Sequence, residues 1–483
     1  MKSISITSSI AVMMGVLTLS SATEAKSGSC PDQTEAKHVL LFSIDGLHQA
    51  DLAEYIAAKP ESTLASLVDS GVEFTNADTS KPSDSFPGLM AQLTGGHPIT
   101  TGVWYDIWYD RSLYTPGSDC TGAPGTITTF TQLIDIDPKD INGGGSTNVT
   151  ALPRILKDGK CEPLYPHQYP RVNNLFQVAR SHGLVTAWAD KHTAAYDIAR
   201  GTDGQGLTEL YVPEIASVPV EVGPTIAYDN LHANAFLNWI KGKDALGEKQ
   251  IGIPSVFGGN FQAVNVAQKN VGTPSAALSQ AIDSVDTSLG KVVDGLKDAG
   301  TYKNSVIIIS AINGNAPRNM SEIKRVNPAI LPAVLGNVSI SYTLTHDAGM
   351  FFLANQSDTF KAASSAYANA DKVHLTTLWA GEGLRIAGFG DPAKDPRVPD
   401  IMFQSEPGTL FDIDPAHIAV HGGFNLDDTN VPLIVSSPLL EKQKRTEHVE
   451  TTQIAPTILC LLGLDPNELE AVQIEGTEVL PIF

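Results

Sequence analysis

The stretch HVLLFSIDG, residues 38–46, indicates the fold class of this chain. Residues 38–44 are mostly apolar and favour strands, which is typical of a parallel strand buried on both faces. A second run of this kind, SVIIIS at residues 305–310, follows an amphipathic helical pattern over residues 277–299. Strands that alternate with helices predict an α/β fold with a doubly wound, mostly parallel sheet and helices on both faces.

Asp45 directly follows the first predicted strand, at the edge where sheets of this kind bind ligands. Gly46 beside it permits close approach of a ligand to the backbone. The carboxylate of Asp45 is a hard oxygen ligand that suits a divalent cation. The alternative is that Asp45 only caps the helix predicted over residues 50–58.

Lys191 and His192 follow another predicted strand, residues 184–188. An ammonium group fixed at this edge can pair with a phosphate or carboxylate of a substrate. The alternative is an ion pair of Lys191 with Asp190 or another nearby acid. The positions therefore predict a substrate-binding role for Lys191, and more weakly for His192.

Ser85 lies in the segment KPSDSFPGLM, residues 81–90, at or just before the start of a helix predicted over residues 86–93. Unpaired backbone N–H groups and the positive end of the helix dipole favour a phosphoryl group there. A metal ion would lower the pKa of the hydroxyl and make it a nucleophile. The alternative is that Ser85 only caps the helix.

The chain has 483 residues and a net charge of −21. Its length allows one large α/β domain or two ordinary domains. The negative charge disfavours nucleic acids and anionic membranes as partners, so we expect no nucleic-acid binding. An anionic substrate would need a locally positive pocket.

The N-terminus has the pattern of a secretory signal peptide over residues 1–25. Lys2 precedes an apolar run at residues 10–19, and small residues follow up to Ala25. The alternative is a buried N-terminal helix. No other apolar run is long enough to span a bilayer, so we expect a secreted mature chain, residues 26–483, that does not contact a membrane after cleavage.

Residues 109–170 are rich in Gly, Pro, Thr and Asp and read as an insertion. Four cysteines in an exported chain suggest two disulfides, with three possible pairings. Cys120 and Cys161 bracket the insertion, so we favour Cys120–Cys161 together with Cys30–Cys460. Four sequons also predict a glycoprotein if the host glycosylates; they begin at Asn148, Asn319, Asn337 and Asn355.

Several motifs follow one another along the chain: strand-Asp-Gly, Ser-Phe-Pro about forty residues later, LTGGHP at 93–98, WYD at 104–106, ADKH at 189–192 and HGGFNLDDT at 421–429. In this combination the chain resembles the type I phosphodiesterase/nucleotide pyrophosphatase family of the alkaline-phosphatase-like superfamily, and most of all a fungal-type secreted subgroup. Around Lys191 it is also similar to phosphonoacetate hydrolases. The resemblance spans about residues 38–465 and implies one alkaline-phosphatase-like hydrolase domain.

The resemblance implies a metal-dependent hydrolase that acts on a small phosphate ester or phosphonate and uses one or two divalent ions, expected to be zinc. Asp45 and His421 match metal ligands of the family, although His421 alone would read as a loop histidine. Ser85 matches the nucleophile, which also binds metal.

The chain departs from the family pattern at two places. The family has Ser-Asp-His-Gly after its strong strand, whereas Ile312 and Asn313 stand here in place of the acid and the histidine. The family's Asp-x-x-x-His pair should fall near residues 257–264, which contain no carboxylate or histidine. His346 and Asp347 are partial substitutes, because the subgroup has two acids there. The predicted metal ligands are thus Asp45, Ser85, Asn313, His346, Asp347 and His421.

Two functions follow as hypotheses. The first is an active hydrolase with a covalent phosphoserine intermediate. The second is a catalytically weak or inactive family member that acts as a secreted binding protein. A sulfatase is disfavoured, because Ser85 lacks the Arg that follows in a Cys/Ser-x-Pro-x-Arg context. Convergence of the predicted ligands on one point would favour a metal site.

Overall fold

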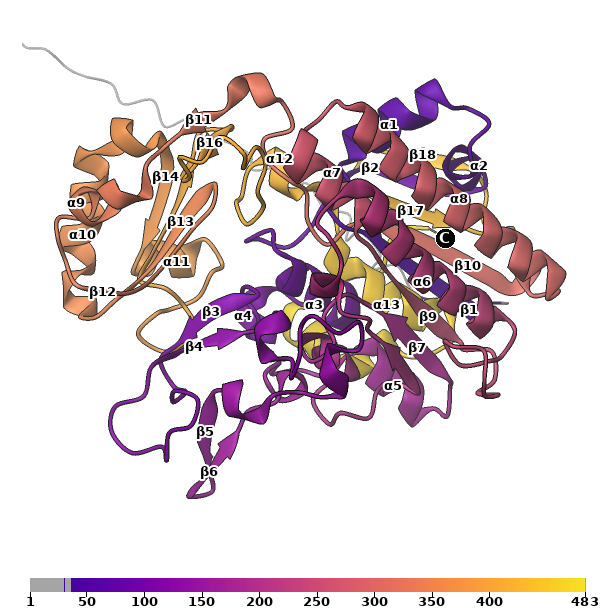
Figure 1. The fold of residues 1–483 in the computed structure, drawn as a ribbon, viewed down its shortest axis with the longest axis horizontal. Helices are drawn as coiled ribbons and strands as arrows, with labels where there is room; N and C mark the ends of the chain where they lie inside the picture. The colour runs from indigo at the N-terminus through magenta and orange to yellow at the C-terminus, as the bar shows by residue number, and fades with distance from the viewer. Residues whose placement is uncertain (1–29, 31–35, 483) are drawn as a thin grey trace, which may run out of the picture.

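The computed structural model describes Cys30 and residues 36–482 (Figure 1). The predicted signal peptide, residues 1–25, lies outside the described residues. None of the helices in the described part of the chain combines the length and apolar character that a membrane crossing requires.

The main sheet confirms the predicted fold class. Its strands run in the order β18-β2-β17-β10-β1-β9-β7-β8, and β19 also pairs with β2. All neighbouring strands are parallel except β17, which is antiparallel to both β10 and β2. The strands are β1 (His38–Ile44), β2 (Gly71–Asp78), β7 (Thr186–Ala189), β8 (Glu209–Tyr211), β9 (Val256–Phe261), β10 (Ser305–Ser310), β17 (Asn430–Ser436), β18 (Gln443–Arg445) and β19 (Val449–Glu450).

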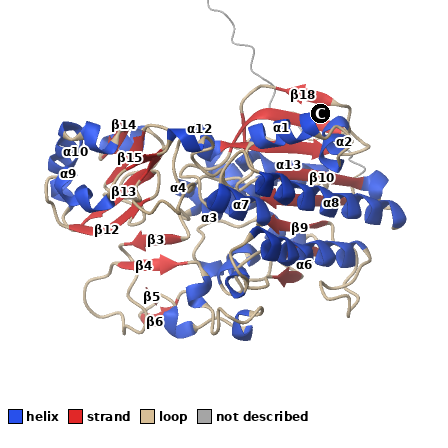
Figure 2. Ribbon diagram, turned by 45° about the horizontal axis from the view of Figure 1, so that its top comes forward, coloured by secondary structure: helices blue, strands red, loops and turns tan. Residues whose placement is uncertain are grey.

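Helices cover both faces of this sheet (Figures 1 and 2). Alternate side chains of β1 enter two separate cores, with Leu40 and Phe42 in one and Val39 and Leu41 in the other. The first core contains apolar side chains of α1 (Gln49–Ala58), α2 (Thr63–Asp69), α6 (Val222–Ile240), α7 (Ala263–Val271) and α8 (Ala276–Asp298). The second contains those of α3 (Ser85–Thr94), α5 (Leu175–Ser181) and α13 (Ile454–Leu461). Burial on both faces explains why the parallel strands are continuously apolar.

A smaller antiparallel sheet, which the sequence patterns did not reveal, lies beside the main body (orange in Figure 1). Its order is β12 (Ile340–Thr345), β13 (Ala348–Leu353), β15 (Ile401–Ser405) and β14 (Leu375–Ala380). Helices α9 (Leu331–Val334) and α10 (Thr359–Ala368) share its core. Nearby are α11 (Glu382–Ile386) and the paired strands β11 (Lys324–Arg325) and β16 (Thr409–Leu410). The turn between β12 and β13 carries His346 and Asp347.

The predicted insertion forms two hairpins, β3 (Ile107–Asp110) with β4 (Thr126–Thr129) and β5 (Arg154–Lys157) with β6 (Lys160–Pro163). The disulfide Cys120–Cys161 closes it, and Cys30–Cys460 joins the start of the described chain to α13. Both predicted pairings are confirmed. The remaining helices are α4 (Pro98–Thr101), α12 (Leu426–Thr429) and α14 (Glu470–Glu475).

His97, in the LTGGHP motif, links the start of α4 to the C-terminal helix α14. Its backbone N–H donates to Glu475 Oε1 at 2.9 Å, and its Nδ1 lies 2.6 Å from Glu475 Oε2. Its Nε2 lies 3.2 Å from Glu450 Oε2. Burial by itself lowers the pKa of His97, but the two carboxylates outweigh it and raise the pKa to about 10.

We expect this histidine to make the stability of the fold sensitive to alkaline pH. Since the folded pKa lies above the unfolded value, the ion pairs stabilise the fold fully below about pH 6.5, and this stabilisation is lost as the pH rises toward 10. The free energy of unfolding, measured in urea across this range, should fall more steeply for the natural chain than for His97→Gln. The ring is 38% exposed, so solvent screening reduces the effect. Equal slopes for the two proteins would contradict this expectation.

Candidate active site

Asp45, Ser85 and Lys191 meet at the carboxyl edge of the main sheet. Asp45 follows β1, Ser85 begins α3, and Lys191 lies two residues after β7. Lys191 Nζ lies 2.5 Å from Asp45 Oδ2 and donates to Ser85 Oγ at 3.1 Å. The ammonium group therefore bridges the carboxylate and the hydroxyl.

The carboxylate of Asp45 is fully buried and held by two donors on one oxygen. Gln262 Nε2 donates to Oδ2 at 2.8 Å, alongside Lys191. Oδ1 has no hydrogen-bond partner in the described chain. Burial raises the pKa of Asp45, but the positive charges of Lys191 and Lys269 outweigh it, so the pKa lies below its ordinary value. Asp45 is therefore ionised at neutral pH.

Lys191 is positioned by the turn after β7. The Asp190 carboxylate accepts from the backbone N–H of Lys191 at 3.0 Å and from Trp188 Nε1 at 2.9 Å. Burial lowers the pKa of Lys191, but the charges of Asp45 and Asp190 outweigh it and raise the pKa above its usual value. The Asp45–Lys191 pair is thus an ion pair in which both partners are charged.

Ser85 is the first residue of α3, and its hydroxyl is not the cap of the helix. Asp84 is the N-cap, because its carboxylate accepts from the backbone N–H of Phe86 at 3.2 Å. Ser85 Oγ makes a long contact of 3.5 Å with Asn313 Oδ1. This approach of α3 to the end of β10 requires Gly88, since a Cβ there would lie 2.0 Å from the carbonyl oxygen of Ile312.

A second polar cluster lies next to Ser85 and contains His421 and His346. His421 Nδ1 lies 3.5 Å from Asp84 Oδ2. The hydroxyl of Tyr105 lies 2.6 Å from His346 Nδ1 and donates to the carbonyl oxygen of His421 at 3.0 Å. Burial lowers the pKa of His421 well below its usual range, so its imidazole is neutral. Asp84 is buried beside Asp106, and both effects raise the pKa of Asp84 well above its usual value.

Asp347 lies close to Asp428. A Cβ built on Gly423 would lie 2.5 Å from Asp347 Oδ2 and 2.7 Å from Asp428 Oδ2, so both carboxyls approach the space that a side chain at this glycine would fill. Burial and the charge of Asp347 raise the pKa of Asp428 well above its usual value. A proton shared by the two carboxyls accounts for their proximity.

The six predicted metal ligands therefore fall into separate groups. Asp45 and Ser85 contact the ammonium of Lys191, and Asn313 lies 3.5 Å from Ser85, whereas His346 and His421 belong to the neighbouring cluster and Asp347 lies beside Asp428. Within residues 36–482 and Cys30, no group of three or more His, Cys, Asp or Glu side chains is placed to hold a metal ion. Ile312 and Val264 are buried in the two cores, and neither can ligate. The donors around Ser85, a single carboxylate with neutral amides, do not fit a zinc ion.

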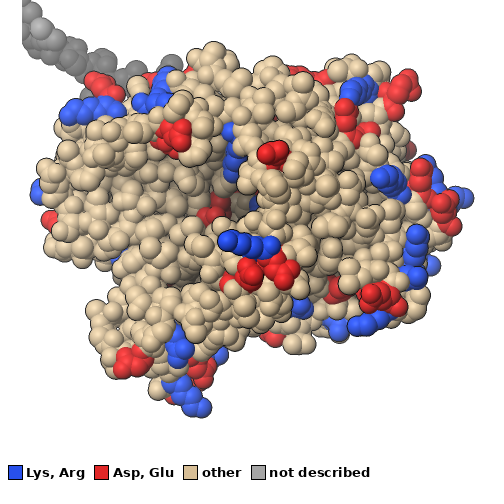
Figure 3. Space-filling model, in the orientation of Figure 1, with Lys and Arg blue, Asp and Glu red and all other residues tan. Residues whose placement is uncertain are grey.

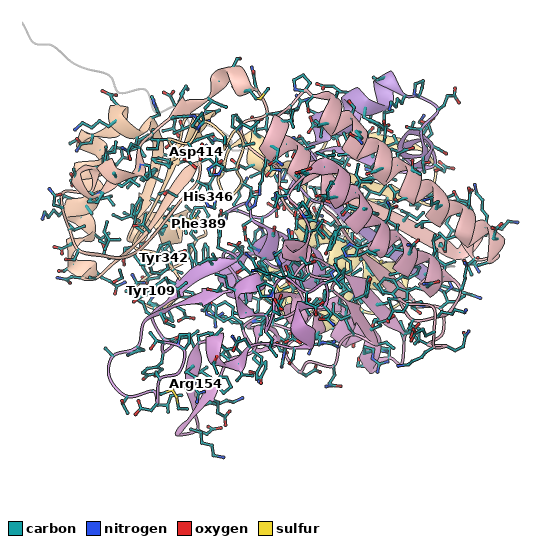
Figure 4. The ribbon with its side chains drawn as sticks, viewed as in Figure 1. Tyr109, Arg154, Tyr342, His346, Phe389 and Asp414 are labelled. Atoms are coloured by element: carbon teal, nitrogen blue, oxygen red, sulfur yellow. A yellow bond between two sulfur atoms is a disulfide. The ribbon has the colours of Figure 1, made fainter. Side chains whose placement is uncertain are left out.

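A pocket of about 660 Å³ opens over this centre. Its polar lining includes Ser85, Lys191, His192, Lys269 and His421. Much of the rest of its wall is apolar: Phe86, Phe130, Ile215, Val218, Pro219, Val220 and Val266. Figure 3 shows the molecule hollowed between the small sheet and the main body, and in Figure 4 His346 lies on the side of the small sheet that faces the main body.

The two predicted substrate-binding residues both line this pocket. His192 Nδ1 lies 2.8 Å from Glu214 Oε1. Burial and the charge of Lys191 lower the pKa of His192 to about 3, so the ring is neutral. His192 can therefore donate or accept a hydrogen bond but carries no charge for an anion.

Lys269 on α7 is a pocket residue that the sequence patterns did not single out. It forms no ion pair with any residue in the described part of the chain, so its charge is available to an anion. Asp84 and Tyr105 were also missed. Tyr105 lies within the motif WYD and Asp84 directly precedes Ser85, so these motifs could have pointed to both residues. For Lys269, the sequence offered only its position in the helix that follows β9.

Comparison with known proteins identifies the family of this chain. The profile of the type I phosphodiesterase/nucleotide pyrophosphatase family matches residues 39–415. None of the curated proteins matches the sequence significantly.

Solved structures share the fold at low sequence identity. Murine ectonucleotide pyrophosphatase/phosphodiesterase 5 is 15% identical, with a TM-score of 0.59 over 89% of this chain and 96% of that chain. An inactive variant of the murine protein, in complex with AMP, has a TM-score of 0.60, 15% identity and the same coverage. The human protein is 14% identical, with a TM-score of 0.58 over 88% of this chain and 95% of that chain. With the profile covering most of its length, this chain belongs to the type I phosphodiesterase/nucleotide pyrophosphatase family.

Proposed function

We propose that this chain hydrolyses a small phosphate ester or phosphonate with Ser85 as the nucleophile. The observation that carries the proposal is the position of Ser85 Oγ. It lies at the start of α3 and on the wall of the pocket, 3.1 Å from the buried ammonium of Lys191. The helix dipole and the ammonium both favour a phosphoryl group at this point.

The chemistry consists of two displacements at phosphorus. Ser85 Oγ forms a bond to phosphorus while the bond to the leaving oxygen breaks, and the hydroxyl proton ends on that oxygen. Water then attacks the phosphoserine and regenerates the Ser85 hydroxyl. Lys191 and Lys269 bind and orient the phosphoryl oxygens, since both line the pocket.

The apolar wall of the pocket supports a substrate whose phosphoryl group carries an apolar or aromatic part. A pocket of this volume suits a ligand of nucleotide size. The murine neighbour bound to AMP has the same fold, which makes a nucleotide-like phosphate ester a reasonable first choice among test substrates.

Members of this family generally depend on divalent metals. Dependence on zinc remains a prediction here, and the donors around Ser85 give it little support.

We also infer that the mature chain is secreted, since it has two disulfides and lacks free cysteines in its described part. Of the four sequons, Asn319, Asn337 and Asn355 are exposed and Asn148 is half-buried, which is compatible with glycosylation.

Replacement of Ser85 by alanine tests the proposed nucleophile. Hydrolysis of bis(p-nitrophenyl) phosphate, or of the p-nitrophenyl ester of phenylphosphonate, should fall to the background rate in Ser85→Ala. Ser80→Ala is a matched control, because Ser80, just before residues 81–90, is also buried but does not line the pocket. If Ser85→Ala keeps the natural rate, Ser85 is not the nucleophile.

The second candidate function is a secreted binding protein without turnover. It is favoured by the loss of the family's acid and histidine at Ile312 and Asn313. This candidate predicts that phenylphosphonate binds to the purified chain, whereas no ester in the panel is hydrolysed, with or without added zinc.

A further inference from the structure

We propose that the ammonium of Lys191 takes the place of a divalent metal ion at the Asp45–Ser85 centre, so that this chain binds a phosphoryl anion there without metal. The inference rests on the proposed function, because it concerns the cation of the same centre. It differs from the metal dependence that the family resemblance implies.

The first argument is the position of the ammonium group. A metal ion at this centre would bind one oxygen of Asp45 and the hydroxyl of Ser85. Lys191 Nζ already contacts both, at 2.5 Å and 3.1 Å. Since ligand bonds to zinc are about 2 Å long, an ion on the same carboxylate oxygen would lie within about 5 Å of the ammonium. The two positive charges would repel each other in a buried site.

The second argument is the balance of charge. Among the side chains that contact Ser85 Oγ or the Asp45 carboxylate in the described part of the chain, Asp45 has one anionic group to offer a metal, and the ammonium of Lys191 already balances it. Asn313 and Gln262 are neutral, and Gln262 directs its amide nitrogen toward Asp45 at 2.8 Å. A divalent ion is usually held by several anionic or imidazole ligands, and this centre does not provide them.

The third argument is that Lys191 is held in place before any ligand binds. Its side chain is 9% exposed. The turn that carries it is fixed by Asp190, whose carbonyl oxygen accepts from the Tyr228 hydroxyl at 3.3 Å. With Lys269 on the same pocket, the centre presents two ammonium groups to an anion, although Asp106 and Asp412 also line the pocket.

The first experiment measures metal content and anion binding in the natural chain. After dialysis against EDTA and return to zinc-containing buffer, mass spectrometry of the elements should find no stoichiometric zinc. Titration calorimetry should give the same affinity for phenylphosphonate in EDTA and in zinc. Retention of about one zinc ion per chain, or loss of phenylphosphonate binding in EDTA, would overturn the proposal.

The second experiment tests Lys191 directly. In Lys191→Ala, the affinity for phenylphosphonate in EDTA should fall by about tenfold or more, the size expected for a charge-assisted contact. Lys291→Ala is the control, since Lys291 is exposed on α8. An unchanged affinity in a folded Lys191→Ala protein would also overturn the proposal.

The third experiment asks whether the ammonium excludes a metal. The double variant Lys191→Ala/Asn313→His removes the ammonium and adds an imidazole beside Ser85, so it should gain zinc binding. The single variant Asn313→His adds the same ligand but keeps Lys191, so it should not. If both variants bind zinc with the same affinity, Lys191 does not compete with a metal and the proposal is overturned.

These measurements separate the inference from the proposed function. If hydrolysis requires zinc and stops in EDTA, the inference fails and the proposed function stands. If phenylphosphonate binds in EDTA but no ester is hydrolysed, the proposed function fails and the inference stands.

Discussion

Replacing Lys191 by methionine is expected to lower the free energy of unfolding by about 3–5 kcal/mol, the usual cost of leaving one partner of a buried ion pair unpaired. The side chains of Lys191 and Asp45 are 9% and 1% exposed, so solvent cannot compensate the remaining carboxylate. Among the residues that the structure describes, Gln262 alone would still donate to the Asp45 carboxylate. Urea unfolding at neutral pH, in EDTA, measures the loss.

A double-mutant cycle assigns this loss to the ion pair. In Asp45→Asn/Lys191→Met both charges are absent, so most of the lost stability should return relative to Lys191→Met. Asp45→Asn alone should also destabilise, because it leaves a buried ammonium. If Lys191→Met stays within about 1 kcal/mol of the natural chain, the pair does not have the buried, charged character described here.

Removing the Cys30–Cys460 disulfide is expected to lower the free energy of unfolding by roughly 2–5 kcal/mol. This bond spans 430 positions of sequence and joins the chain before β1 to Cys460 on α13, which is fully buried. Closing so long a loop restricts the unfolded chain strongly. The double variant Cys30→Ala/Cys460→Ala should therefore unfold at a lower urea concentration under non-reducing conditions.

The Cys120–Cys161 bond provides the matched control. It closes a separation of only 41 positions within the insertion, so the loop-entropy model makes its loss about 2 kcal/mol smaller. A larger loss of stability in Cys120→Ala/Cys161→Ala than in Cys30→Ala/Cys460→Ala would contradict the entropic explanation.

The main sheet could be predicted because its signals are local. The run at residues 305–310 coincides with β10, and the helix predicted over residues 277–299 appears as α8, Ala276–Asp298. A continuous apolar run or a helical period depends on neighbouring residues, so the sequence displays it directly. The small sheet was not predicted from the sequence, because β13 pairs with β15 about fifty residues later and the edge strands β12 and β14 are only partly buried.

For the site, the sequence alone indicated that Asp45 and Lys191 lie at the carboxyl edge of one parallel sheet and that Ser85 lies at the start of a helix. It left open whether Lys191 pairs with a substrate or with a nearby acid. The tertiary structure decided this, because the strand order β1-β9-β7 brings the ends of β1 and β7 within reach of one side chain.

Asp347, in the turn between β12 and β13, lies beside Asp428, whereas the family resemblance had grouped it with Ser85 as a metal ligand. Which charges meet depends on pairing between strands far apart in the chain. Residue types and their local pattern therefore determined the family and the candidate residues, and only the packed sheet decided that an ammonium faces Asp45.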